Sequence, residues 1–344
     1  MPHTDPLSKK IETTSAVIAN PWKAVLTGTP HFDKLQWETS SFGLRWFVAV
    51  RASLLVLTLT SAVIAGLLAW LSGAINFVLW LACVFGLLLA HASNNILNDY
   101  IDFARGLDQG NYYRVRYGTH VLNDGLVSKR KAKVYILLTG SAALVSALGI
   151  LIAVDWRVLT PVAIGAFILL FYTYPLKTLG LGEMAVLLVW GPLMVGGTFH
   201  VVSGYWSWPV SIVGAVTALG PTSLILAKHV DKLSSDEAKG VRTLPVRLGE
   251  ACARKLIQLT LLLMYASVLM CIVIGWLPTG TLLICLAIPA AIDFNQILNS
   301  EKPAQCPSLY PEFAWPLWFA AHAFSHARKF GLYLVLGLGS GVLL

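Results

Sequence analysis

Residues 75–100 read INFVLWLACVFGLLLAHASNNILNDY, an apolar run that ends in a cluster of asparagine and aspartate. The apolar part is long enough to cross a hydrocarbon layer about 30 Å thick as a helix. Polar side chains that directly follow such a run lie at the membrane boundary or face the interior of a helix bundle. The stretch therefore predicts a membrane-spanning helix that carries a polar site at one end.

Comparable apolar runs recur along the whole chain. It has 344 residues, of which 56% are hydrophobic and only 12% are charged, and its mean hydropathy is +0.70. This composition excludes a typical soluble enzyme, a disordered chain and a coiled coil. It predicts an all-α, polytopic membrane protein with about nine transmembrane helices. We expect the spans at residues 45–71, 75–100, 132–154, 158–174, 181–201, 207–228, 255–276, 278–294 and 330–344.

The basic residues predict an orientation in the membrane. With the N-terminus inside, 24 of the 25 Lys and Arg residues fall on or near the cytoplasmic side, and only Arg157 falls in a turn on the opposite side. This is the asymmetry of the positive-inside rule. The net charge of +8 therefore reflects topology and not the binding of nucleic acid. We expect residues 1–40 to form a cytoplasmic tail and residues 41–344 to form one transmembrane domain with cytoplasmic active-site loops.

The first of two acidic clusters lies at the cytoplasmic end of the second span. Four of its polar residues share one helix face because they occupy positions i, i+3, i+4 and i+7: Asn95, Asn98, Asp99 and Asp102. Gly106 supplies a place for the chain to turn and bring Asp108 back toward them. Oxygen ligands suit a hard cation such as Mg²⁺, which keeps several waters and bridges to phosphate. The cluster therefore predicts a magnesium site.

The second cluster follows the sixth span and mixes carboxylates with basic groups. It reads KHVDKLSSDEAKGVRT from Lys228 to Thr243. Such a mixture suits a metal–diphosphate, because the metal neutralises part of the anion while Lys and Arg bind the remaining oxygens. Either cluster alone is compatible with a solvated helix end. Two of them on one membrane face favour a single shared site.

These motifs resemble those of the UbiA superfamily of intramembrane prenyltransferases. The run Asn98-Asp99-x-x-Asp102, with Asp108 beyond it, resembles the first aspartate-rich motif of the family, and residues 231–236 resemble the second. The segment YTYPLK at 172–177, which leads to GLGE at 180–183, is similar to the loop after the family's fourth span. The first motif is most similar to that of the 1,4-dihydroxy-2-naphthoate prenyltransferases of menaquinone synthesis. The resemblance covers roughly residues 45–290 and implies a central cavity that opens to the cytoplasmic side.

The second motif departs from the family pattern. The family usually spaces its two aspartates at i and i+4, whereas Asp231 and Asp236 are five apart and Lys232 stands at position i. An i,i+5 pair points about 140° apart on a regular helix, so we expect a break near residues 234–235 that lets both carboxylates meet one metal. In the alternative, Lys232 replaces the missing carboxylate. His229 also stands where the family has an asparagine.

The resemblance implies a Mg²⁺-dependent enzyme that ionises an allylic isoprenyl diphosphate and transfers the prenyl group to an aromatic quinone precursor. The implied metal ligands are Asn98, Asp102, Asp108, Asp231 and Asp236. The implied substrate contacts are Arg51, Arg116, Lys177, Lys232, Lys239, Arg242, Tyr172 and Tyr174. Among all of these, we expect catalysis to depend most on Asn98, Asp102, Lys177 and Asp236.

Two other functions stay open. A UbiA-type terpene cyclase would ionise the same diphosphate and need no acceptor. The altered second motif leaves this alternative open. A transporter or lipid-binding protein commonly shows inverted repeats, whereas both acidic motifs here run in the same direction and face the same side. The expected partners are an isoprenyl diphosphate, an aromatic acceptor and the lipid bilayer, with no nucleic acid.

The cysteines and the C-terminal histidines form no further motif. The five cysteines show no CxxC pair and fall mostly in the spans, which indicates packing and not a disulfide set. His322 and His326 are four residues apart, but no third metal ligand can be placed beside them. We expect both histidines at a helix surface.

Overall fold

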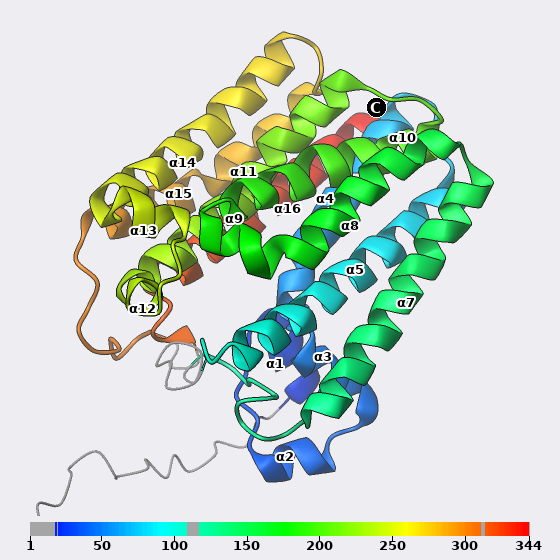
Figure 1. Ribbon diagram of the computed structural model, residues 1–344. Coiled ribbons are helices and arrows are strands. Elements are labelled where there is room, and N and C mark those ends of the chain that lie inside the picture. The colour runs from blue at the N-terminus through cyan, green and yellow to red at the C-terminus, as the bar shows by residue number, and fades with distance from the viewer. Residues whose placement is uncertain (1–17, 19, 109–116, 311–313, 344) are drawn as a thin grey trace, which may run out of the picture.

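A computed structural model describes residues 18, 20–108, 117–310 and 314–343. Within these ranges the chain forms helices joined by turns and loops, and no strand (Figure 1). The shorter helices are α1 (Pro21–Thr27), α2 (Lys34–Thr39), α3 (Phe42–Ala49), α9 (Gly182–Leu188), α10 (Gly197–Ser203), α12 (Leu233–Ala238) and α13 (Leu244–Leu248). The longer helices are α4 (Leu55–Leu71), α5 (Phe77–Ala104), α7 (Lys129–Ala153), α8 (Leu159–Phe171), α11 (Trp208–Asp231), α14 (Glu250–Val273), α15 (Ile288–Asn299) and α16 (Trp318–Leu343).

Eight helical segments of the described chain are long and apolar enough to cross a membrane. They are Ala52–Leu71, Phe77–Ala104, Lys129–Ala153, Trp156–Leu179, Gly182–Ser203, Trp208–Asp231, Glu250–Val273 and Thr279–Asn299. The predicted all-helical, multi-pass membrane fold is confirmed. The ninth expected span, residues 330–344, is the second part of α16. The whole helix is less apolar than the eight segments above because it also carries Arg328 and Lys329. This helix packs between α4 and α11 on one side and the segment 279–299 on the other, while Arg328 and Lys329 stay exposed (Figure 1).

The first expected span is broken at Arg51. This residue adopts φ 53° and ψ 58° after the end of α3, and a short 3₁₀ turn at Ala52–Leu54 then leads into α4. A left-handed conformation of a residue other than glycine costs on the order of 1–3 kcal/mol and needs support from the surroundings. Asn95 supplies part of that support, because its Nδ2 donates to the carbonyl oxygen of Val50 at 2.8 Å. The break directs Arg51 inward, toward α5.

The fourth and fifth spans are kinked. Tyr174 has extended backbone angles (φ −150°, ψ 126°) directly before Pro175, and Gly191 departs from helical angles before Pro192. Proline removes one backbone donor and crowds the preceding turn, which explains why each span is kinked at the residue before a proline. At Gly191, a Cβ atom would lie 2.9 Å from the backbone of Ala215 on α11, so only glycine allows this close approach. The first kink carries residues 172–183 across the end of α5.

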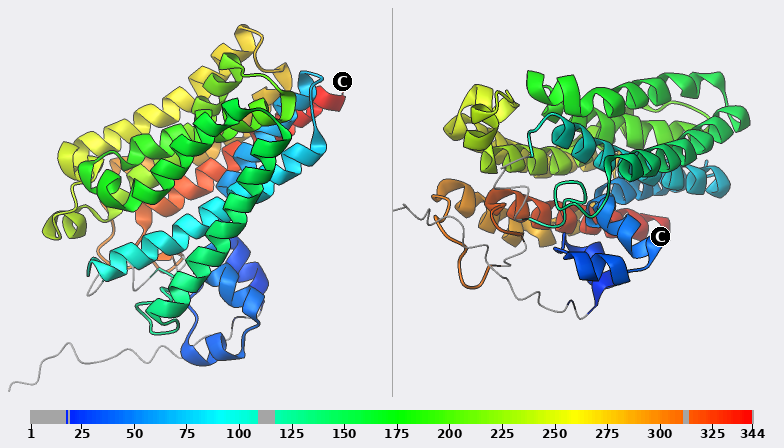
Figure 2. Two further views of the ribbon diagram at one scale, coloured as in Figure 1. Left: turned by 45° about the vertical axis from the view of Figure 1, so that its right-hand side comes forward. Right: turned by 60° about the horizontal axis from the view of Figure 1, so that its bottom comes forward.

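The N-terminal helices α1 and α2 pack on the end of the bundle where α5 ends and α7 begins (Figure 2). Val25, Phe32 and Trp37 are buried in one cluster with Leu44, Val48, Ala92 and Val121. Asp33 caps α2 by accepting from the backbone N–H of Gln36 at 2.7 Å. The described part of the expected tail therefore covers the polar end of the bundle. The domain boundary at residue 40 stays a prediction.

Candidate active site

A cavity of about 1160 Å³ lies among α4, α5, α7, α8, α11, α16 and the segment 182–203. It reaches from Asp102 at the end of α5 to Cys83 near its start, and these residues are 19 positions apart, or about 28 Å of helix. The inner part is apolar and is lined by residues such as Leu87, Leu144, Ile168 and Val201. The cavity therefore combines one charged end with a long apolar channel.

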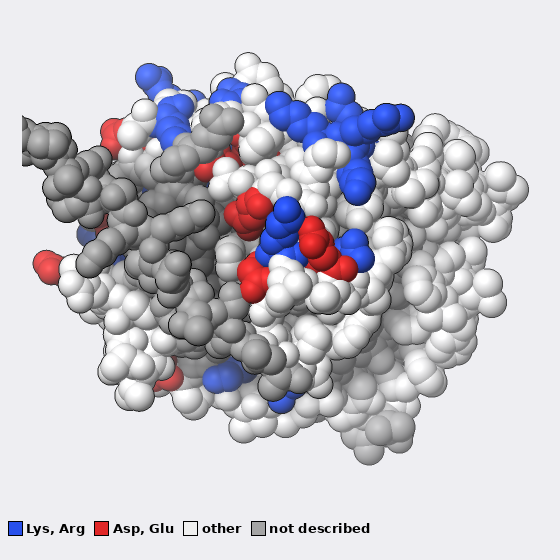
Figure 3. Space-filling view, turned by 90° about the horizontal axis from the view of Figure 1, so that it is seen from below, with Lys and Arg blue, Asp and Glu red and all other residues white. Residues whose placement is uncertain are grey.

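Basic and acidic side chains line the charged end in nearly equal number. Among the described residues, the cations are Arg51, Lys177, Lys228, Lys232 and Lys239, and the anions are Asp99, Asp102, Asp108 and Asp236. Figure 3 shows this end of the molecule, with acidic and basic side chains intermixed at its centre and further basic side chains along one rim. Because this lining carries a formal charge of only +1, a multiply charged anion needs additional cations to bind there.

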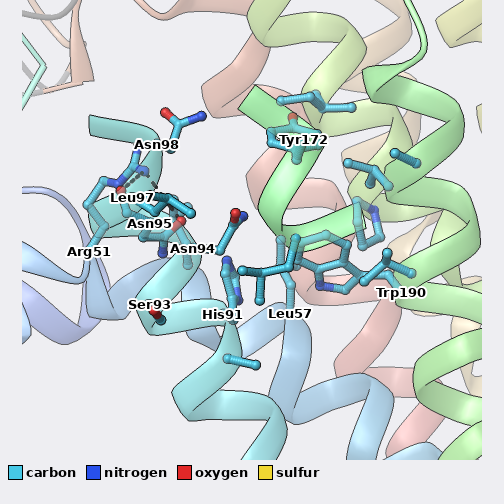
Figure 4. A pocket seen from close by; sticks show the side chains of 18 of the residues that line it. Arg51, Leu57, His91, Ser93, Asn94, Asn95, Leu97, Asn98, Tyr172 and Trp190 are labelled. Atoms are coloured by element: carbon cyan, nitrogen blue, oxygen red, sulfur yellow. Dashed lines mark hydrogen bonds between the residues drawn. The ribbon is translucent and has the colours of Figure 1, made fainter. Parts of the chain in front are cut away.

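Arg51 contacts the first acidic cluster from the break between α3 and α4. Its Nη2 donates to the backbone oxygen of Asn95 at 3.1 Å and to the side-chain oxygen of the same residue at 3.3 Å (Figure 4). It also lies 3.5 Å from Oδ1 of Asp99. The guanidinium is buried and lines the cavity, as expected for a residue that binds substrate there.

Asp102 and Lys177 form a buried ion pair between α5 and the kinked segment. Nζ of Lys177 donates to Oδ1 and Oδ2 of Asp102 at 2.8 and 2.6 Å. One turn earlier, Nδ2 of Asn98 donates to Oγ1 of Thr173 at 3.1 Å. These contacts hold the segment 172–179 against the polar face of α5. Asp102, which is expected to bind metal, and Lys177, which is expected to bind diphosphate, therefore contact each other directly. A ligand bound here must contact both side chains.

Asp108 returns to the cavity through the turn predicted at Gly106. Gly106 has φ +72°, and the following N–H, of Leu107, donates to the carbonyl oxygen of Asp102 at 2.9 Å. Asp108 lines the cavity, and its Oδ2 lies 2.7 Å from Nε2 of the fully buried His120. The expected approach of Asp108 to the first cluster is confirmed, and His120 is a partner that the sequence did not reveal.

The second cluster places Lys232 and Asp236 at the cavity. Helix α11 ends at Asp231, and the short helix α12 follows Lys232. Nζ of Lys232 lies 3.5 Å from Oδ1 of Asp236, and both residues line the cavity. Burial opposes the charge on Lys232, but the carboxylates of Asp236, Asp102 and Asp108 outweigh this effect and raise its pKa above the ordinary value. The two acidic clusters therefore act electrostatically on the same lysine.

Asp231 points away from this cavity. Its Oδ1 accepts from Nζ of Lys302 at 2.8 Å and from the backbone N–H of Trp318 at 3.1 Å. Its Oδ2 accepts from the backbone N–H of Ala320 at 2.9 Å, so the carboxylate caps the start of α16. The helix breaks at Lys232 and not at residues 234–235, and this break leaves Asp231 outside the cavity lining. The expected metal role of Asp231 does not fit this position, and Lys232 takes the cavity-facing position.

Two of the other expected contacts lie elsewhere. Tyr172 lines the cavity, but Tyr174 is 53% exposed, with the guanidinium of Arg105 4.0 Å from its ring centre. Arg242 is exposed and is absent from the cavity lining; its carbonyl oxygen accepts from Nε of Arg247 at 3.2 Å. The expected roles of Tyr174 and Arg242 therefore do not fit the structure. Arg116 lies outside the described residues.

The polar face of α5 extends one turn deeper than expected. His91 and Asn94 line the cavity together with Asn98 and point toward Tyr172 and Trp190 (Figure 4). Nδ1 of His91 lies 2.8 Å from Oγ1 of Thr58, and the His91 ring meets the Trp190 ring edge to face at 5.1 Å. The sequence carried a signal for this longer polar face. Residues 91, 94 and 98 lie at helical spacing and continue the face that is predicted from residue 95 onward.

The connection before α16 closes one side of the cavity. Tyr310, Leu317 and His322 line it. Nδ1 of His322 lies 2.8 Å from the carbonyl oxygen of Trp318, and the Tyr310 ring is stacked on the His322 ring at 6.1 Å. His326 is buried, with Nε2 2.9 Å from the hydroxyl of Tyr265. The expected surface position of both histidines is wrong, because α16 lies inside the bundle.

The oxygen donors fit Mg²⁺ that is partly held by a phosphate. Among the described residues, no three His, Cys, Asp or Glu side chains gather into a metal cluster. Asn98, Asp102, Asp108 and Asp236 nevertheless line one cavity from two sides. Mg²⁺ commonly binds one or two carboxylates and completes its octahedron with water and substrate phosphate. The residues fit such an ion and do not form a closed protein cage.

Comparisons with known proteins agree with the fold and the cavity. Residues 59–321 match the model of the UbiA prenyltransferase family. The 2-carboxy-1,4-naphthoquinone phytyltransferase of Synechocystis sp. is 27% identical over 276 residues, which cover 76% of this chain and 85% of that protein. The 1,4-dihydroxy-2-naphthoate octaprenyltransferase of Escherichia coli is 27% identical over 61% of this chain and 70% of its own length.

A solved structure of a UbiA homolog from Archaeoglobus fulgidus, bound to GPP and Mg²⁺, shares the fold. Its TM-score is 0.50 at 16% identity, and the alignment covers 84% of this chain and 100% of that one. The family match includes the first acidic cluster, the kinked segment and the second cluster, and so covers the charged end of the cavity apart from Arg51. This multi-pass membrane protein is therefore a prenyltransferase that belongs to the UbiA prenyltransferase family.

Proposed function

We propose that the protein ionises an isoprenyl diphosphate in this cavity and transfers the prenyl group to an aromatic quinone precursor. The observation that carries the proposal is the cavity itself, in which a charged end and an apolar channel together extend along about 28 Å of α5. The diphosphate binds at the charged end and the isoprenoid tail lies along α5. The naphthoate and naphthoquinone acceptors in the names of the two relatives support the choice of acceptor.

Neutralising the diphosphate is the main chemical task of the charged end. Mg²⁺ would be held by Asn98, Asp102, Asp108 and Asp236, and it would supply the charge that makes diphosphate a good leaving group. The homolog with bound GPP and Mg²⁺ supports this assignment. Lys177, Lys232 and Lys239 act on the remaining phosphate oxygens as fixed positive charges.

The aromatic residues below the charged end protect the allylic cation. Tyr172 and Trp190 line the cavity where the polar face of α5 gives way to the channel (Figure 4). An aromatic ring face attracts a cation by about 0.5–2 kcal/mol, depending on how well water is excluded. The apolar channel keeps water away from the cation until the acceptor captures it.

An assay with and without acceptor tests the proposal. We expect purified protein with geranylgeranyl diphosphate and Mg²⁺ to form a prenylated product from 1,4-dihydroxy-2-naphthoate, and to lose this activity in excess EDTA. Without the acceptor, we expect only slow hydrolysis to the prenyl alcohol. A cyclised hydrocarbon or cyclic alcohol from the acceptor-free reaction would instead establish a terpene cyclase. Release of diphosphate with neither product would contradict both functions.

We also propose that the charged end faces the cytoplasm. Cysteines introduced at the exposed positions Lys131 and Glu237 should react with a membrane-impermeant maleimide in vesicles whose cytoplasmic face is outward. A cysteine at Trp156, in the turn between α7 and α8, should react only in vesicles of the opposite orientation. The native exposed Cys252 and Cys285 and the half-buried Cys306 are first replaced by serine. Labelling of Lys131→Cys and Glu237→Cys from opposite faces would contradict a shared site at one end of the bundle.

A further inference from the structure

A carboxylate–histidine pair lies behind the charged end. Nδ1 of His229, on α11, lies 2.6 Å from Oε1 of Glu183, on α9. Both side chains are almost completely buried, with exposures of 3% and 2%. The second carboxylate oxygen, Oε2, has no hydrogen-bond partner among the described residues. Glu183 therefore directs its hydrogen bonding toward the imidazole.

The imidazole separates the carboxylate from the cavity. His229 lines the cavity, whereas Glu183 does not. Because Nδ1 is bonded to Glu183, Nε2 is the ring atom left for the cavity, and it makes no hydrogen bond within the described part of the chain. A carboxylate on one ring nitrogen fixes the tautomer and the ring orientation, and it stabilises the imidazolium that forms when the other nitrogen takes a proton. The pair has the arrangement of an oriented general base.

The other proton-accepting groups of the cavity have different partners. Asp99, Asp102 and Asp236 form ion pairs with Arg51, Lys177 and Lys232, and Asp108 bonds to His120. His91 bonds to a threonine hydroxyl, and His322 bonds to a backbone carbonyl oxygen. Among the histidines that line the described cavity, His229 is therefore the one whose ring is oriented by a carboxylate. It lies three residues before Lys232 on the same helix end, close to the diphosphate position.

We propose that Nε2 of His229 takes the hydroxyl proton of the aromatic acceptor, with Glu183 as the residue that positions the ring; this rests on the proposed function. The C1–O bond of the substrate breaks, and its electron pair leaves with the diphosphate. A ring carbon of the acceptor forms the new bond to C1, while the electrons of the acceptor's O–H bond become the carbonyl bond of a dienone. The proton moves to Nε2. The other substituent of the attacked carbon then leaves as CO₂ or as a proton, its bonding electrons restore the aromatic ring, and the carbonyl oxygen takes up a proton to become a hydroxyl again.

The test measures how ionisation is divided between transfer and hydrolysis. Wild-type protein with geranylgeranyl diphosphate, Mg²⁺ and 1,4-dihydroxy-2-naphthoate should form nearly one prenylated acceptor for each diphosphate released. His229→Asn should lower this ratio at least tenfold, with prenyl alcohol as the other product, because the groups that ionise the diphosphate are retained. Glu183→Gln should lower it less, since the amide still bonds to the ring. The matched control is His326→Asn, the same change at a buried histidine outside the cavity lining, which should leave the ratio unchanged.

The outcomes separate the base from the overall reaction. A wild-type ratio in His229→Asn, or a loss of transfer in His326→Asn alone, would overturn the role of His229 while the proposed function stands. Wild-type protein that releases diphosphate but forms no prenylated acceptor would overturn both. If His229→Asn fails to fold in detergent, His229→Gln makes the same comparison, because glutamine also has no group that accepts a proton at neutral pH.

Discussion

Replacing Asp102 by asparagine is expected to lower kcat at least about 100-fold at saturating Mg²⁺, diphosphate and acceptor. The variant loses one carboxylate of the charged end, where the leaving diphosphate must be neutralised. Removing one group of such an electrostatic site costs on the order of 3 kcal/mol in the barrier, or about 100-fold in rate. Asparagine keeps the volume of the side chain, so the cavity retains its shape. Near-normal turnover would exclude Asp102 from the metal site.

The ion pair with Lys177 requires a control, because Asp102 also neutralises a buried ammonium at 2.6 Å. Loss of one partner of a buried pair destabilises a protein, whereas removal of both is often nearly neutral. Asp102→Asn should therefore lower the Tm in detergent, and the double variant Asp102→Asn with Lys177→Met should recover much of it. If the double variant also recovered turnover, Asp102 would be only a structural partner of Lys177.

The spans of this fold could be predicted because the thickness of the membrane fixes how long an apolar run must be to cross it as a helix. The breaks within them could not, because distant residues stabilise them. Arg51 is held in its left-handed conformation with help from Asn95, which lies 44 residues away and bonds to the preceding carbonyl. The start of α16 was also missed, since the residue that caps Trp318 is Asp231, 87 residues earlier. No local pattern reports either contact.

The first acidic cluster could be predicted in detail because its geometry is that of one helix and one glycine turn. Asn98 and Asp102 share a face of α5, and Gly106 returns Asp108 to the cavity. The second cluster crosses a helix end, where spacing no longer fixes direction. The same limit applies to Tyr174, which the kink at Pro175 turns outward although Tyr172, two residues earlier, lines the cavity.

Replacing Asp231 by asparagine is expected to reduce stability far more than catalysis. Three donors end on this carboxylate: the Lys302 ammonium and the backbone N–H groups of Trp318 and Ala320. The asparagine removes the carboxylate that the Lys302 ammonium binds and turns an N–H donor toward one of the three donors. Breaking a buried pair in this way costs on the order of 3–5 kcal/mol, so the Tm in detergent should fall by several degrees. The matched variant Asp236→Asn, at the cavity, should keep its Tm better and lose its turnover.

The contrast between these two aspartates decides how this chain differs from the family pattern. If Asp231 only anchors the start of α16, the folded fraction of Asp231→Asn should turn over at close to the wild-type rate below its transition, with an unchanged Mg²⁺ requirement. The double variant Asp231→Asn with Lys302→Met should regain stability, because both members of the ion pair are then removed. A variant with the wild-type Tm, lost turnover and a steeper Mg²⁺ requirement would return Asp231 to the metal site. Lys232 would then be an additional diphosphate contact beside that site, and not a replacement for the second carboxylate of the motif.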